Sequence, residues 1–263
     1  MISGLVLSVL LVSCFNSRGG RVEAQASEGS AGNSERARLV AVMGSAELPE
    51  VVSQRLLAFS AGDDAFYTDL SRCLAEDTHL RKLVDKQHPL PPGYAPSDLV
   101  TLRDSSYRVS RAGMMLRGVA EVALAEMAAA ARGDGVTLVV SSAYRSYDYQ
   151  VEVYGRIVRE MGQESADRES ARPGHSQHQT GLVADFGSID DSFAATAAGR
   201  WMVANAARFG WSLSFPDGYE AVTGYRWESW HYRYVGKPLA AFIDTYFDGI
   251  QQYALRFLHE WEK

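Results

Sequence analysis

The chain has 263 residues, of which 46% are hydrophobic and 22% are charged. This composition is ordinary for a folded domain with a core of its own, and two cysteines are too few for a disulfide framework. A formal net charge of −6 excludes nucleic acid as the main partner, because phosphate backbones select basic surfaces. The net charge leaves metal binding open, since local ligands capture a metal.

The first fourteen residues form an apolar run that ends in the letters LVSC at positions 11–14. The run is too short to span a bilayer, which takes about 20 residues, but it has the length of a signal-peptide core. LVSC resembles a bacterial lipobox, in which the cysteine is lipidated, although no Lys or Arg precedes the run. We therefore expect a lipoprotein-type signal peptide at 1–14 with Cys14 as the lipidation site. A buried core helix is the alternative.

Residues 15–38 are rich in Gly, Ser, Ala and Glu, a composition typical of a disordered tether. Helical apolar spacing then runs from Leu48 to Val84, with a break at 62–64 where Asp64 is a candidate N-cap. This predicts an N-terminal helical segment that buries Cys73 as a small apolar residue. The proline-rich stretch 88–96 should be extended surface chain.

The remaining elements are expected to alternate between helix and strand. Ala, Met, Leu and Glu dominate 110–131 without a proline, which predicts a long helix. The expected elements after it are a strand at 137–141, a helix at 147–161, a polar loop at 165–180, a strand at 182–186, a helix at 194–209, strands at 211–215 and 231–235, and an amphipathic helix at 238–261. This order predicts an α+β fold with a small, mostly antiparallel sheet flanked by helices.

Two histidines and one aspartate have a spacing that suggests a metal site. His178 and Asp185 lie seven residues apart with a glycine between them, and His231 follows 46 residues later. Two imidazoles and one carboxylate form a three-ligand set for catalytic zinc, which keeps its fourth position for water. Each residue alone is more often structural, but together they predict a Zn2+ site on the sheet.

A spare carboxylate and a cation accompany this set. Glu228, three residues before His231, is the candidate base that takes a proton from water and passes it to the leaving amine. Residues three apart on a regular strand face opposite sides, so a turn must separate the two. Arg145, just past a predicted buried strand, can hold a substrate carboxylate or a developing oxyanion. The alternatives are a rim charge for Glu228 and a solvated ion pair for Arg145.

Among the other histidines, His175 is interpreted as a loop residue that contacts substrate or nothing, with a fourth metal ligand or a gate as alternatives. No role is predicted for His79, His88 and His259, which lie near charged segments.

These segments resemble the VanY-type D-alanyl-D-alanine carboxypeptidases, zinc metallopeptidases related to D-Ala-D-Ala dipeptidases and the hedgehog signalling domain. The family pattern Ser-x-His-x-x-Gly-x-Ala-x-Asp matches positions 176–185, with Val183 at the alanine position. Glu-x-x-His matches 228–231, and Tyr-Arg-Ser-x-x-x-Gln matches 144–150. Positions 83–100 also resemble the family, and the likeness covers roughly 80–236.

The resemblance implies a role for each matching residue. It implies zinc ligands at His178, Asp185 and His231, and a catalytic base at Glu228. The resemblance also implies that the terminal D-alanine and its carboxylate are contacted by Arg145, Gln150 and Ser176. Residues 39–263 would form one metallopeptidase domain with an N-terminal helical extension and a catalytic core at about 80–236.

The expected function is removal of the C-terminal D-alanine from D-Ala-D-Ala pentapeptide stems of peptidoglycan, by an exported monomer that touches the membrane only through its lipid anchor. An L,D-carboxypeptidase acting on tetrapeptides and a D,D-dipeptidase are alternatives. A zinc-containing lipoprotein that binds peptidoglycan without cleaving it is a third. Glu228 distinguishes an enzyme from a non-catalytic binding protein, because a spare carboxylate beside three intact ligands favours catalysis.

Overall fold

The computed structural model describes residues 34–62 and 64–263. The predicted signal peptide with Cys14 lies outside these residues, as does most of the predicted tether. The last tether residues, from Ser34, are helical, and this helix continues to residue 45. Residues 42–263 form one compact unit, which contains everything described below. Within the described residues, no helix is both long and apolar enough to cross a bilayer.

Helices α2 (Glu50–Gly62) and α3 (Ala65–Ala75) follow the helix that ends at residue 45. Cys73 is buried on α3, as predicted. Asp64 occupies the N-cap position of α3, as predicted, although its side chain makes no capping hydrogen bond. The predicted helix is wrong beyond Ala75. There the Arg81 guanidinium donates to the carbonyls of Cys73 and Glu76, which satisfies the helix end.

The long helix predicted for 110–131 is wrong in its first part. Residues Met115–Arg117 form strand β3, which pairs antiparallel with β1 (Leu99–Thr101), and helix α4 occupies only Gly118–Gly133. Gly113, just before β3, has a φ of +82°, which a right-handed helix cannot accommodate. Strand pairing over a distance thus overrides the helix propensity of this composition.

The central sheet has five strands in the order β2-β4-β5-β7-β6. Their bounds are β2 Arg108–Val109, β4 Val139–Ser142, β5 Val183–Phe186, β6 Trp211–Leu213 and β7 His231–Tyr234. Only β2 and β4 pair in parallel, so the predicted mostly antiparallel α+β fold is confirmed.

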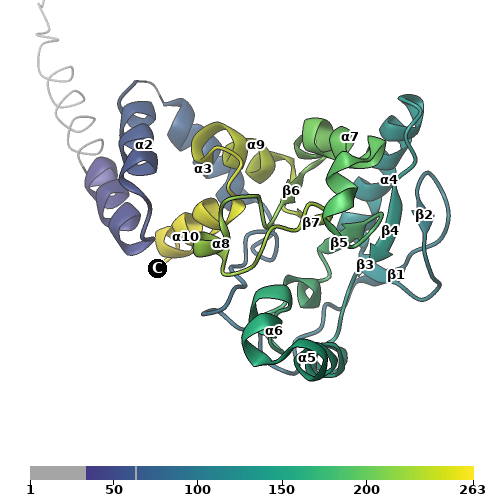
Figure 1. The fold of residues 1–263 in the computed structure, drawn as a ribbon. Coiled ribbons are helices and arrows are strands. Elements are labelled where there is room, and N and C mark those ends of the chain that lie inside the picture. The colour runs from purple at the N-terminus through teal and green to yellow at the C-terminus, as the bar shows by residue number, and fades with distance from the viewer. Residues whose placement is uncertain (1–33, 63) are drawn as a thin grey trace, which may run out of the picture. The chain divides into compact units, whose positions relative to one another are not determined.

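One face of this sheet packs into the hydrophobic core, and the other carries the predicted site residues. Side chains alternate between faces along a strand, and Phe186 and Tyr232 join the core that includes Leu124 and Met127 of α4. Asp185 and His231, the residues adjacent in sequence to these two, therefore point to the opposite face. Figure 1 shows α4 and α7 beside the sheet and α5 and α6 together at the lower end of the molecule.

Helices and short turns connect the later strands. These elements are α5 (Tyr147–Met161), α6 (Gln163–Glu169), η1 (Gln177–Thr180), η2 (Asp191–Ala195), α7 (Ala197–Asn205), η3 (Ala206–Phe209) and α8 (Glu220–Thr223). The predicted polar loop at 165–180 thus includes most of α6 and all of η1. The predicted C-terminal helix is two helices, α9 (Lys237–Phe247) and α10 (Gln251–Trp261), because Asp248 and Gly249 both have positive φ.

Candidate active site

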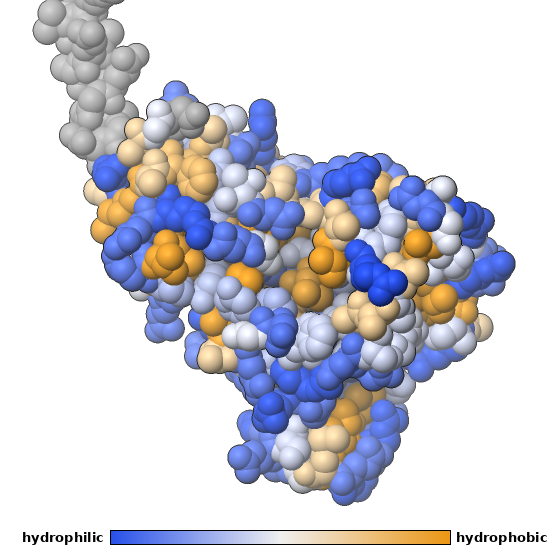
Figure 2. Space-filling model, turned by 45° about the horizontal axis from the view of Figure 1, so that its top comes forward, coloured by the Kyte–Doolittle hydropathy of each residue, from blue (hydrophilic) through white to orange (hydrophobic). Residues whose placement is uncertain are grey.

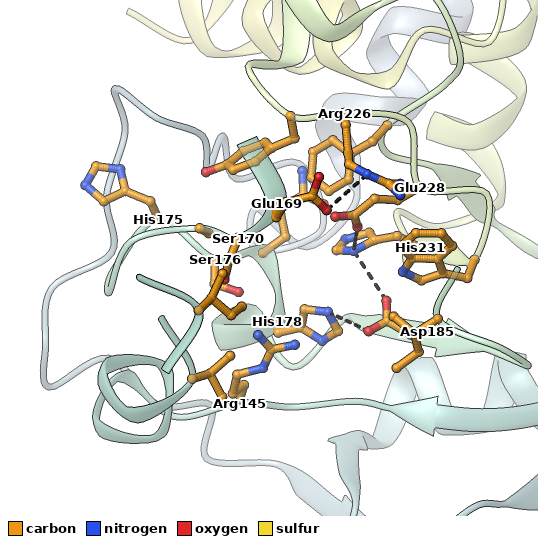
Figure 3. Close-up of a pocket in the computed structure, with 18 of the residues that line it drawn as sticks. Arg145, Glu169, Ser170, His175, Ser176, His178, Asp185, Arg226, Glu228 and His231 are labelled. Atoms are coloured by element: carbon orange, nitrogen blue, oxygen red, sulfur yellow. Dashed lines mark ion pairs between the residues drawn. The ribbon is translucent and has the colours of Figure 1, made fainter. Parts of the chain in front are cut away.

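His178, Asp185 and His231 meet at one point although they are distant in sequence (Figure 3). One ligand atom from each residue lies within 4.8 Å of the others, and all three residues are buried. His178 Nε2 is 3.2 Å from Asp185 Oδ2, and His231 Nδ1 is 3.3 Å from Asp185 Oδ1. Among the described residues, this is the one group of three or more His, Cys, Asp or Glu side chains close enough to share a metal ion.

The donor atoms of this group fit a divalent metal. His178 Nδ1 lies 2.7 Å from the carbonyl oxygen of Ala143. A carbonyl can only accept, so Nδ1 carries the proton and the Nε2 lone pair faces Asp185. Asp185 Oδ1 is buried and accepts no hydrogen bond in the described structure, a costly state unless a cation satisfies it. Two imidazoles and one carboxylate match the ligand preference of zinc.

Burial and neighbouring charges keep His178 and Asp185 in the forms that can bind a metal. Burial lowers the pKa of His178 to about 4, so the imidazole is neutral at pH 7. Burial acts to raise the pKa of Asp185, but the adjacent histidines and Arg145 hold it at about 2. Metal ligands must be deprotonated, and both residues meet this condition.

Glu228 lies beside the candidate ligand group, which is His178, Asp185 and His231 and is called the ligand group below. Its Oε2 is 3.0 Å from His231 Nδ1, and its side chain is only 13% exposed. The backbone N–H of His231 donates to the carbonyl of Glu228, so the predicted turn between them is confirmed. Burial raises the pKa of the Glu228 carboxyl group, although His231 opposes the shift. A carboxylate with a raised pKa is suited to accept and return a proton near neutral pH.

Arg145 follows strand β4 and lines the same cavity as the ligand group. Its Nη1 donates to Gln150 Oε1 at 2.8 Å, and its Nη2 lies 3.5 Å from Ser142 Oγ. Burial lowers the pKa of Arg145, while Asp185 and Glu228 act to raise it. A guanidinium keeps its charge in proteins, so Arg145 supplies a fixed positive charge next to the two carboxylates.

Gln150 and Ser176, which the sequence predicted together as substrate contacts, lie in different surroundings. Gln150 is fully buried on α5, and its Nε2 donates to the carbonyl of Ala171 while its Oε1 accepts from Arg145. Because its amide is engaged on both sides and does not line the cavity, Gln150 is placed to position Arg145. Ser176 does line the cavity.

The ligand group opens into a cavity of about 360 Å³. One wall comes from apolar side chains of α5, namely Val153, Ile157 and Met161. In Figure 2 the lower lobe, where α5 and α6 lie in Figure 1, carries an apolar strip between hydrophilic flanks. The cavity therefore offers an apolar wall next to a strongly polar floor.

Sequence reasoning missed Arg226 at the rim of this cavity. Arg226 forms ion pairs with Glu169 at 3.0 Å and with Asp191 at 2.8 Å, and its guanidinium lies 5.4 Å from the ring centroid of Trp230. It thereby ties the end of α6 and the start of η2 to the segment before β7. These three segments are distant in sequence, and no local pattern links them.

His175 is not a fourth member of the ligand group. It is half-buried and lies at the side of the cavity, away from Asp185 and His231 (Figure 3). Its Nδ1 is 2.8 Å from the carbonyl oxygen of Asp85, so it donates there.

An α+β fold whose sheet presents two imidazoles and a carboxylate, with a second carboxylate and a guanidinium beside them, defines a metallohydrolase-type protein. The family model of VanY, D-alanyl-D-alanine carboxypeptidase, matches residues 113–237. The chain belongs to this family, as its motifs predicted.

Curated relatives agree with this assignment. The chain is 39% identical over 168 residues to the putative carboxypeptidase YodJ of Bacillus subtilis (strain 168), which covers 61% of this chain and 62% of the relative. It is 30% identical over 167 residues to a D-alanyl-D-alanine carboxypeptidase of Enterococcus faecium, with coverages of 61% and 52%. The matched region thus spans about half to three fifths of the length of these relatives.

Solved structures share the fold. The LdcB LD-carboxypeptidase superposes with a TM-score of 0.57 at 36% identity, covering 64% of this chain and 85% of that one. A glutamate-to-alanine mutant of the vancomycin resistance D,D-pentapeptidase VanY, in complex with Zn(II), superposes with a TM-score of 0.55 at 31% identity, covering 65% and 96%.

Proposed function

We propose that this protein is a zinc-dependent carboxypeptidase that removes the C-terminal D-alanine from peptidoglycan stem peptides ending in D-Ala-D-Ala. The observation that carries the proposal is the placement of the ligand group, Glu228 and Arg145 on one cavity. A metal site with a base cleaves an amide bond, and a guanidinium beside it selects a chain end that carries a carboxylate. The Enterococcus faecium relative, named for this activity, and the Zn(II) complex of VanY support the same reading.

Each residue of the site has its own part in the proposed reaction. His178, Asp185 and His231 would hold zinc, which when bound would supply Lewis-acid chemistry that polarises the scissile carbonyl and lowers the pKa of a bound water towards about 7. Glu228 accepts the proton of the attacking water and delivers it to the leaving amine of D-alanine. Arg145 binds the terminal carboxylate and so sets which peptide bond lies at the ligand group.

A second candidate is an L,D-carboxypeptidase that removes D-alanine from tetrapeptides. It is favoured by one observation, the 36% identity to the LdcB LD-carboxypeptidase against 31% to VanY. Both reactions use the same metal group, base and guanidinium. They differ in the configuration of the residue before the scissile bond.

Mass spectrometry of purified pentapeptide and tetrapeptide muropeptides after digestion by the zinc-replete protein tests both candidates. The D,D-activity converts pentapeptide to tetrapeptide and stops there. Conversion of tetrapeptide to tripeptide without attack on pentapeptide would assign the L,D-activity instead. If both substrates stay intact, the enzyme reading is wrong and peptidoglycan binding without cleavage remains.

We further propose that the protein is exported and held at a bacterial membrane through lipid on Cys14. The lipobox-like letters LVSC at 11–14 and the apolar run before them support this location. A substrate in the cell wall requires an enzyme outside the cytoplasm, and a lipid anchor would keep the enzyme near that substrate.

A further inference from the structure

A second cavity, of about 240 Å³, adjoins the one that holds the ligand group. Ser170, His175 and Tyr225 line both cavities. The metal ligands, Glu228 and Arg145 do not line the second one. Its remaining lining residues are Lys86, Asp167 and Arg172. The second cavity therefore lies next to the reacting groups but has a chemistry of its own.

Lys86 is held in place at this cavity. Its Nζ donates to the carbonyl of Asp167 at 2.9 Å and lies 4.8 Å from the ring centroid of Tyr225. Its aliphatic stem covers Gly224, where an added Cβ would come within 2.8 Å of Lys86 Cδ. An ammonium group has three donors, and one is used here. The described residues offer no hydrogen-bond acceptor to the other two, which can therefore bind a ligand.

The charges around Lys86 leave the cavity with an excess of positive charge. The Asp167 carboxylate accepts two hydrogen bonds from the Arg172 guanidinium, at 2.8 and 2.9 Å. The nearby Glu220 carboxylate is paired in the same way with Arg168. Since each carboxylate is paired with its own arginine, Lys86 adds a positive charge beyond these two ion pairs. A ligand with a carboxylate would complete the arrangement.

Packing connects the second cavity to the ligand group. The Tyr225 ring lies 5.0 Å from the Phe215 ring, and the Phe215 ring lies 4.6 Å from the imidazole of His231. Tyr225 is itself buried. Because these rings form one packed row, a ligand group bound at Lys86 is held at a defined place relative to the metal ligands.

We propose that the second cavity is a carboxylate-binding subsite for the part of the peptide that precedes the scissile bond, with Lys86 as its main contact. This inference rests on the proposed function, in which Arg145 holds the chain end and a single D-alanine is removed. A peptide anchored at its C-terminus can extend only upstream, so what enters the second cavity is an earlier residue. The preferred substrates are stem peptides that keep a free carboxylate upstream, rather than the amidated form.

Two peptides that differ in one group test this subsite. They are L-Ala-γ-D-Glu-L-Lys-D-Ala-D-Ala, whose glutamate has a free α-carboxylate, and the same peptide with that carboxylate converted to an amide. Binding is measured by calorimetry on zinc-loaded Glu228→Gln protein, where turnover is suppressed. We expect the carboxylate peptide to bind about 10-fold more tightly, equivalent to about 1.4 kcal/mol.

Lys86→Met in the same Glu228→Gln background keeps the stem that covers Gly224 but removes the charge. It should bring the Kd of the carboxylate peptide to that of the amide, and Lys86→Arg should restore part of the difference. Lys82→Met removes another exposed lysine and should leave the preference unchanged. Two results would overturn the subsite. One is equal binding of both peptides to the Glu228→Gln protein that retains Lys86. The other is that Lys86→Met weakens the binding of both peptides equally.

The proposed function is tested separately with the same peptides. D-alanine release is measured on the protein with Glu228 intact. If neither peptide yields D-alanine, the carboxypeptidase proposal fails. The binding comparison still decides whether Lys86 binds the carboxylate.

Discussion

Asp185 and His231 are direct partners across strands β5 and β7. Residues paired in this way point to the same face of a sheet with their Cβ atoms about 5 Å apart. Two of the three proposed metal ligands are therefore brought together by strand register alone. The third, His178, comes from η1, immediately before β5, and is oriented by the carbonyl of Ala143 after β4.

Asp185→Asn should abolish zinc binding. The amide keeps the shape of the carboxylate but loses the charge that balances the metal. We expect affinity to fall by more than about 100-fold, since loss of outer-shell partners alone costs 10- to 100-fold. Zinc content after dialysis against a weak chelator measures the effect, with Asp190→Asn at the rim as the matched control. Unchanged zinc stoichiometry would show that Asp185 is not a ligand.

Glu228→Gln should separate metal binding from turnover. Glutamine fills the same space but cannot accept the water proton, so D-alanine release should fall by about 10²- to 10⁴-fold while zinc content stays the same. Both quantities are measured on one preparation. Activity near the wild-type level would exclude Glu228 as the base, and loss of zinc would indicate a ligand instead.

Gln150→Met should raise KM more than it lowers kcat. Without the Gln150 amide, Arg145 loses the acceptor that fixes its Nη1. A hydrogen bond to a charged group is worth about 1.5 to 3 kcal/mol, so KM for a D-alanine-terminated peptide should rise by about 10-fold or more. Gln150→Glu, which keeps an acceptor for Arg145, should retain more of the affinity. A drop in kcat alone would contradict the positioning role.

Asp85→Asn should change how stability depends on pH. Burial acts to raise the pKa of Asp85, but donors from Gln87, His88 and Gln252 lower it overall. With a folded-state pKa below the unfolded value of about 3.9, ionised Asp85 stabilises the fold above that pH. This contribution is lost as pH falls through the folded-state pKa.

We expect Asp85→Asn to lower the free energy of unfolding at pH 7 by about 1 to 3 kcal/mol. The variant should also lose less stability than the wild type when the pH falls below about 4. Urea unfolding between pH 3 and pH 7 measures both effects. Parallel pH profiles for the two proteins would refute the assignment.

Cys14→Ala should move the protein from the membrane to the soluble fraction of expressing cells. Alanine preserves the apolar run but removes the sulfur that a lipid would modify. Fractionation followed by immunoblotting measures the change, and Cys73→Ala serves as the matched control. A membrane fraction that is the same for wild type and Cys14→Ala would rule out the anchor.

Local patterns sufficed for the parts of the molecule that depend on neighbours in sequence. His178, Asp185 and His231 could be predicted as a metal-binding group because motif spacing and donor chemistry are properties of the chain itself. Short segments of apolar and aromatic residues indicated strands β5, β6 and β7 for the same reason. The need for a turn after Glu228 followed from strand geometry alone.

What the sequence alone determined about this protein is its α+β class and its family, and it also predicted the group His178, Asp185 and His231 that the structure brings together. Only the tertiary structure decided that 115–117 is a strand, that Gln150 faces Arg145, and that Lys86 meets Tyr225 beside the ligand group. These depend on contacts between segments many residues apart. Such contacts form when burial and hydrogen bonding are satisfied across the whole fold at once. Local propensity depends only on neighbours in sequence and therefore does not predict them.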